Sequence, residues 1–132
     1  MSKFTVFVLI IMLRLFYQPA TNQYSAPFAS PAPQTTLSAT FLSFNGSLKN
    51  HRVFLEWKVS ENETADCFQV EKSTDGASYS LVALVFGTDK LHTDTYPYYE
   101  TLDKQKTFYR IKLISKNKQI TYSRSLTIIP AA

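Results

Sequence analysis

The chain has 132 residues, 45% of them apolar and 14% aromatic, which is typical of one globular domain. Fourteen Lys and Arg against ten Asp and Glu give +4, and without Lys3 and Arg14 of the N-terminal segment the balance is twelve minus ten, or +2. So small a charge gives no reason to expect a nucleic-acid partner. The single cysteine, Cys67, excludes an intrachain disulfide.

Residues 1–26 have the layout of a signal peptide. Lys3 supplies a positive charge, and residues 4–13 form an apolar stretch of about ten residues, half of what a membrane span needs. Neither Ala20 nor Ala26 completes a small-x-small cleavage signal, so the cleavage site stays open, and the alternative is a segment retained as a membrane anchor. We expect an exported protein that resides in the periplasm, in the cell envelope or outside the cell.

Residues 27–36 form a linker of Pro, Ala and Ser. They carry Pro27, Pro31 and Pro33 and no charged residue, a composition that favours an extended chain. The folded domain is therefore expected at residues 37–129, about ninety residues, close to the size of an immunoglobulin-like sandwich.

A run of strands with matching phase follows. In residues 52–59 the apolar side chains occupy every second position: Val53, Leu55, Trp57 and Val59. Residues 67–73 repeat the period with Phe68 and Val70. Ser73-Thr74-Asp75-Gly76 then offers a side chain that can bond its own backbone and a glycine that accepts positive φ, which predicts a reversal into a strand at 79–85.

Two further strands flank this run. Residues 37–44 form the first predicted strand, which Asn45-Gly46 is expected to end. Residues 96–101 form a short aromatic strand, and Pro97 favours an edge position because proline cannot donate to a ladder.

In the last third of the chain, the first predicted strand alternates apolar and polar side chains. Residues 107–115 place Tyr109, Ile111 and Leu113 inward. Residues 119–129 put Ile120, Tyr122, Leu126 and Ile128 on one parity. Arg124 falls on that parity too, so either a bulge around Ser123 re-phases the strand or Arg124 lies at the sandwich margin with its head group in solvent.

Seven short strands without a helical period predict an all-β antiparallel sandwich. Its predicted core consists of Val53, Leu55, Trp57, Phe68, Val70, Tyr109, Ile111 and Leu113.

Three strings carry a family resemblance: W-K-V-S-E-N-E from Trp57, F-Q-V-E-K-S-T-D-G from Phe68 and F-Y-R-I-K from Phe108. With them the chain resembles, over about residues 37–128, the fibronectin type III-like module of secreted Bacteroidetes proteins, which often stands before a type IX secretion sorting domain. The resemblance implies an immunoglobulin-like fold. It also implies a tyrosine corner, in which the Tyr109 hydroxyl bonds to upstream backbone with Leu102 packed near it.

No residue pattern predicts an enzyme, a cofactor or a metal. Cys67 has no neighbouring base, because His51 and His92 are each isolated in loops. The carboxylates of one loop, Glu61, Glu63 and Asp66, lack a second cluster or a calcium-loop glycine pattern. The basic residues of the last third, among them Arg110 and Lys112 on one strand face, are typical of a solvated sheet surface.

The leading functional prediction is a noncatalytic exported module with a structural or protein-interaction role. The alternative is a carbohydrate- or peptidoglycan-binding module that stacks sugars on Tyr96, Tyr98 and Tyr99, of which Tyr98 and Tyr99 should point to opposite faces. The expected partner is thus a protein or an envelope glycan, and a membrane only if the N-terminal segment is retained.

Overall fold

Extended backbone dominates the computed structural model, which describes residues 31–33 and 37–131. The predicted signal peptide and most of the predicted linker lie outside these residues. The strands, in chain order, are β1 (Thr40–Lys49), β2 (Arg52–Ser60), β3 (Ala65–Ser73), β4 (Ser80–Phe86), β5 (Asp94–Thr101), β6 (Thr107–Ser115), β7 (Ile120–Tyr122) and β8 (Leu126–Ile128). A short 3-10 helix, Asn62–Thr64, joins β2 to β3, and no helix among the described residues has the length and hydropathy to cross a membrane.

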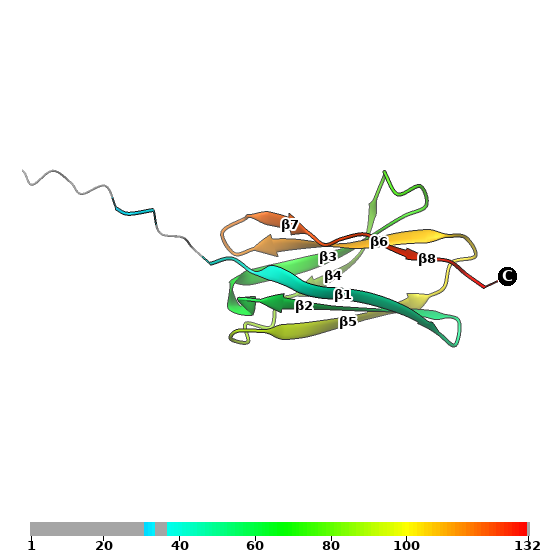
Figure 1. Cartoon of the computed structure of the whole chain (residues 1–132), viewed down its shortest axis with the longest axis horizontal. Helices are drawn as coiled ribbons and strands as arrows, with labels where there is room; N and C mark the ends of the chain where they lie inside the picture. Colours follow the sequence, from blue (N-terminus) through cyan, green and yellow to red (C-terminus); the bar gives the residue numbers. More distant parts are fainter. Residues whose placement is uncertain (1–30, 34–36, 132) are drawn as a thin grey trace, which may run out of the picture. The chain divides into compact units, whose positions relative to one another are not determined.

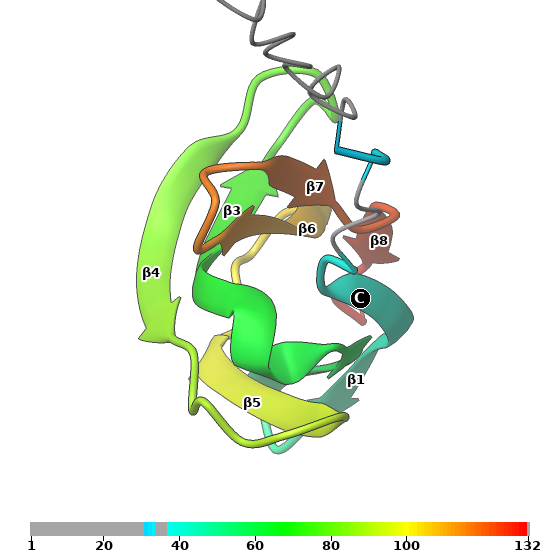
Figure 2. The same cartoon turned by 90° about the vertical axis from the view of Figure 1, so that its left-hand side faces the viewer.

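The strands form two antiparallel sheets. Sheet A has the order β1-β2-β5, and sheet B has the order β4-β3-β6-β7, with β8 also paired to β6. Viewed along the strands, the two sheets lie over one another (Figure 2), so the predicted all-β sandwich is confirmed. Strand β5 pairs only with β2 and is an edge strand, the position that Pro97 indicated.

The space between the sheets holds the core. All eight residues predicted to lie there have no exposed surface, as does Val59. Trp57 lies at its centre, with the Tyr96 ring stacked at 5.8 Å and the Phe68 ring at 5.7 Å between centroids. Alternation on β2, β3 and β6 therefore sorts side chains between core and solvent as the pattern indicated.

The first hairpin departs from the prediction. Strand β1 does not end at Asn45-Gly46 but continues to Lys49, and the chain reverses at Asn50 and His51, whose φ angles are 53° and 58°. Both central residues with positive φ define the turn that matches the twist of a two-residue hairpin. Gly46 has a different role, because a Cβ there would lie 3.1 Å from Leu126 and 3.2 Å from Leu55. Its missing side chain makes room for β8.

The turn after β3 agrees with the prediction. The Ser73 hydroxyl accepts the Gly76 N–H at 2.9 Å, and the Asp75 carboxylate accepts the N–H groups of Ser78 and Ala77 at 2.9 and 2.8 Å. Gly76 has φ +76°, the left-handed region that favours glycine. The backbone hydrogen bonds from Ser78 and Ala77 lower the pKa of Asp75 to about 2.

The predicted strand at 119–129 is two strands, β7 and β8. Between them the Ser123 hydroxyl replaces a backbone acceptor of the ladder: it accepts the Ile111 N–H at 2.8 Å. The break re-phases the chain, so Ile120 and Tyr122 face solvent while Leu126 and Ile128 face inward. The common face expected for these four residues is thus wrong. The chain is re-phased around Ser123, as one alternative held, but by a break between two strands and not by a bulge. Arg124 is exposed and donates to the Phe44 carbonyl of β1.

The hydrogen-bond partner predicted for the Tyr109 hydroxyl in a tyrosine corner is wrong. The Tyr109 hydroxyl donates to the Glu100 carboxylate of β5, not to upstream backbone. Glu100 points between the sheets and also accepts from the Tyr98 hydroxyl at 3.0 Å and from Lys72 Nζ at 3.2 Å. Leu102 does pack against the core. A charged acceptor is within reach of Tyr109, and its hydrogen bond is stronger than one to a neutral carbonyl.

Candidate ligand-stacking site

The three tyrosines predicted to stack on a ligand do not form one platform. They belong to β5, where neighbouring side chains point to opposite faces. Tyr96 is 3% exposed, and its hydroxyl donates to the buried Asn62 side chain. Tyr98 is half-buried against the core, whereas Tyr99 is 55% exposed on the outer face of sheet A. Tyr96 and Tyr98 are therefore unavailable for stacking.

Tyr99 has a neighbour that the prediction missed. Phe54 lies directly opposite it on β2, with ring centroids 4.9 Å apart and planes tilted by 41°. The Arg52 guanidinium lies 5.8 Å from the centre of the Tyr99 ring. The outward parity of Arg52 and Phe54 is visible in the sequence, but their pairing with Tyr99 depends on sheet order.

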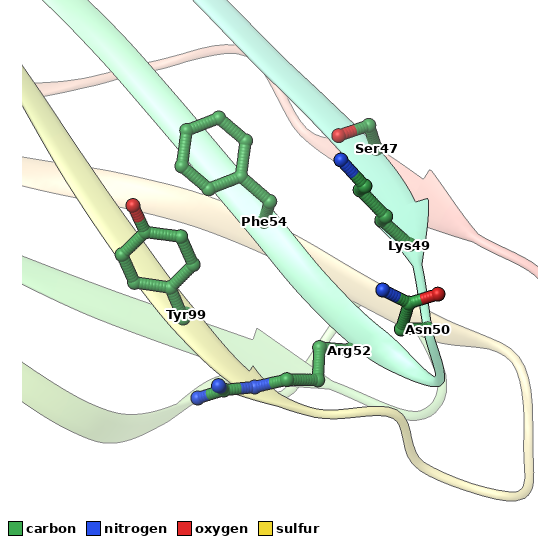
Figure 3. Close-up of a pocket in the computed structure, with 6 residues that line it drawn as sticks. All are labelled: Ser47, Lys49, Asn50, Arg52, Phe54 and Tyr99. Atoms are coloured by element: carbon green, nitrogen blue, oxygen red, sulfur yellow. The ribbon is translucent and has the colours of Figure 1, made fainter.

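These side chains line a shallow pocket of about 300 Å³ on the outer face of sheet A (Figure 3). Its lining residues come from all three strands and from the first hairpin: Ser47, Lys49, Asn50, Arg52, Phe54 and Tyr99. Figure 3 shows the two rings beside each other and the Arg52 side chain reaching toward Tyr99. The pocket thus combines an apolar wall with cationic, amide and hydroxyl groups.

Strand register explains this composition. Ser47, Phe54 and Tyr99 form one row across the sheet, and Lys49, Arg52 and Thr101 form the next row toward the hairpin. Residues opposite one another in antiparallel strands share a face, so each row presents its side chains together. The turn at Asn50 and His51 fixes this register, because it pairs Lys49 with Arg52.

The other groups considered from the sequence have structural roles. Burial raises the pKa of the Cys67 thiol, which opposes thiolate formation. Glu63 accepts the His92 N–H at 2.9 Å within the loops. Among the described residues no cluster of His, Cys, Asp or Glu could hold a metal ion.

Of the predicted basic residues, Arg110 and Lys112 lie on β6 of sheet B, and Arg110 is compensated. Arg110 Nε lies 2.9 Å from a Glu71 carboxylate oxygen, and the guanidinium is held between the rings of Tyr79 and Tyr122, at 3.9 and 4.4 Å from their centroids. Such stacking and pairing leave little of the charge for an anionic ligand.

Comparisons with known proteins show the fold alone. No family profile and no curated protein matches the sequence. Among solved structures, the chain is similar to pectate lyase Pel3 from Pectobacterium carotovorum, with a TM-score of 0.51 and 18% identity over 72% of this chain. Pectate lyase PelI from Erwinia chrysanthemi, solved in complex with tetragalacturonic acid, gives a TM-score of 0.52 and 17% identity over 69% of the chain.

OgpA from Akkermansia muciniphila gives a TM-score of 0.53 with 10% identity over 73% of the chain. The match spans only 27% of Pel3, 28% of PelI and 29% of OgpA. The present chain therefore corresponds to a minor part of each of these proteins.

Proposed function

We propose that residues 37–129 form a noncatalytic, fibronectin type III-like module of an exported protein, and that the module binds carbohydrate at the pocket around Tyr99. The observation that carries this proposal is the exposed Tyr99 ring beside Phe54, with polar side chains around both rings. Aromatic faces that are not needed in the core offer a surface on which sugar rings stack, and a few polar groups then fix orientation.

The comparisons support this direction. Two of the similar structures are pectate lyases, one of them solved with an oligosaccharide, and the matched part is under a third of each chain. A match to so small a part of each enzyme fits an accessory role better than a catalytic one. Fold alone assigns no chemistry, so the proposal rests on the pocket.

The chemistry of the described groups supports the noncatalytic part of the proposal. Catalysis by acid, base or nucleophile needs a titratable group positioned beside a partner in a cleft. The pocket holds Lys49 and Arg52 but no carboxylate, histidine or cysteine. Its groups are suited to bind and orient a ligand, which fits a binding role.

The test is a glycan array followed by titration calorimetry with the domain 37–131. We expect Tyr99→Ala to abolish glycan binding and to change the free energy of unfolding by less than about 1 kcal/mol, because the ring is largely exposed. Tyr98→Ala should instead destabilise the fold, because this ring packs on the core and its hydroxyl binds Glu100.

Tyr122→Ala is the matched control. This tyrosine is 47% exposed, but it lies on sheet B, away from the pocket. It should keep glycan binding intact. An array without hits, or equal binding by the Tyr99→Ala variant, would contradict the proposal.

A protein-interaction role is the second candidate, and the outer face of sheet B favours it. Phe86 is 71% exposed, and it pairs with Cys67, which pairs with Ile114, which pairs with the exposed Ile120. This apolar row crosses four strands and ends on β4, a sheet edge without a charged residue. If Phe86→Ser abolished capture of a partner from envelope extract while Tyr99→Ala did not, this role would replace the carbohydrate role.

A further inference from the structure

We propose that the pocket around Tyr99 selects acidic sugar chains, whose rings carry carboxylates, over neutral ones. The inference rests on the carbohydrate function proposed above and names the ligand class for that site. Its basis is the placement of two cations beside the aromatic row.

Lys49 and Arg52 are those cations, and neither forms an ion pair with any residue that the structure describes. Three other basic residues of the domain are paired: Lys72, Arg110 and Lys116 each lie within 3.2 Å of a carboxylate oxygen. The charge at the pocket is thus left for a ligand. Lys49 and Arg52 are opposite one another in register, and both line the pocket, Arg52 on the side of Tyr99 and Lys49 on the side of Ser47 (Figure 3).

Carboxylates are absent from the pocket lining. On this face of sheet A, Glu56 lies one row beyond Phe54 and Tyr99, on the side away from the hairpin, where it pairs with Asn45 and Pro97. Glu100, next to Tyr99 in sequence, points inward and is engaged by Tyr98, Tyr109 and Lys72. The charged side chains at the hairpin end of this face are therefore Lys49 and Arg52, and Glu56 lies past the aromatic row.

The distance between the aromatic row and the cationic row allows one sugar unit to contact both. Rows on one face of a sheet are about 7 Å apart, twice the rise per residue. A sugar ring on Tyr99 can therefore direct its carboxylate at the row of Lys49 and Arg52. The Arg52 guanidinium offers two parallel N–H donors to a carboxylate, and Asn50 and Ser47 remain for ring hydroxyls.

The experiment compares matched ligands on the domain 37–131 by calorimetry. The probes are tetramers of galacturonic, glucuronic and mannuronic acid, each with its fully methyl-esterified counterpart, which keeps the ring and loses the charge. We expect at least one acid to bind about tenfold or more tightly than its ester, the size of one charge-assisted hydrogen bond. Added salt should reduce the difference.

Variants locate the effect. Arg52→Gln and Lys49→Gln should each remove most of the preference for the acid while binding of the ester persists. Lys58→Gln is the control, because Lys58 is exposed on the same face of β2 but three rows from Arg52. It should leave the preference unchanged.

The outcomes separate the two proposals. Equal binding of every acid and its ester, abolished by Tyr99→Ala, would overturn the selectivity and keep the carbohydrate function. Absence of binding by acids and esters alike, together with an empty glycan array, would overturn both. A preference for the acid that survives in both Arg52→Gln and Lys49→Gln would place the acidic site elsewhere and so overturn the inference.

Discussion

At the scale of single residues, the carboxylate of Glu100 collects three side-chain donors between the sheets. Only 15% of its side chain is exposed, and its donors come from three strands: Tyr98 on β5, Tyr109 on β6 and Lys72 on β3. Partial burial works to lower the pKa of Lys72, but hydrogen bonds to Asp103 and Glu100 outweigh it and raise that pKa. Cation and anion are thus partly compensated where an isolated charge would be costly.

Because of this cluster, we expect the stability of the fold to decrease at alkaline pH. Burial, and then the hydrogen bond to Glu100, raises the pKa of Tyr98 to about 12, and the same causes raise the pKa of Tyr109 further. A tyrosine whose pKa is higher in the folded than in the unfolded state stabilises the fold. This contribution is complete below the unfolded pKa of about 10 and is lost as the pH rises above it. We expect the melting temperature to fall between pH 10 and 12, and Tyr98→Phe to weaken that fall. An unchanged pH profile in Tyr98→Phe would contradict the assignment.

Trp57 is the largest fully buried side chain, and it packs between aromatic rings from both sheets. We expect Trp57→Ala to lower the free energy of unfolding by about 3–5 kcal/mol, out of roughly 5–10 for such a domain. Urea denaturation measures this, with Lys58→Ala on the exposed face of the same strand as the control. A Trp57→Ala variant that melts within a few degrees of the parent would show that the ring is not the anchor.

At the scale of elements, the strands were predictable and their ends were not. The period of two in β2, β3 and β6 follows directly from which side chains must leave water. Asn45-Gly46, the strongest local turn signal, lies inside β1 because tertiary packing needs a small residue under Leu126. The real turn uses Asn50 and His51, and histidine is a weak signal for positive φ. The pocket depends on this register, so its composition could not be predicted from parity alone.

The hairpin gives a test at this scale. We expect His51→Gly to stabilise the domain by up to about 1 kcal/mol, because glycine adopts φ near 58° without steric cost. The hydrogen bond from the Leu102 N–H to the His51 carbonyl uses only backbone and should persist. Thermal melts measure the gain.

Gly76→Ala is the matched opposite, because it places a side chain at φ +76°. It should destabilise by a similar amount. If His51→Gly lowered the melting temperature, the hairpin would not have the positive φ described.

At the scale of the whole molecule, the sheet arrangement agrees with the class that the sequence patterns predicted, while the three-tyrosine platform does not exist. Tyr96 is buried in the core as the stacking partner of Trp57. Side chains on a strand alternate between faces, so the tyrosines of this segment could not all lie on one surface. The single ring left outside gains its significance from Phe54, 45 residues earlier in the chain, which only sheet pairing brings to it.

Export remains a prediction at this scale. We expect the mature protein to lack residues 1 to about 26, because their charge and apolar layout match a signal peptide. Mass spectrometry of the natively expressed protein gives the mature N-terminus. An intact N-terminus on a cytoplasmic species would contradict the prediction.

The length of β1 determines where the pocket lies along the sheet. The chain enters β1 at Thr40 and reaches the hairpin after Lys49, so the ten residues of β1 span about 30 Å of extended strand (Figure 1), and Ser47 and Lys49 at its far end line the pocket. The start of β1 and the Tyr99 pocket therefore lie at opposite ends of sheet A. A ligand on Tyr99 would be met at the hairpin end of the sheet, the length of β1 away from the residue at which the strand begins.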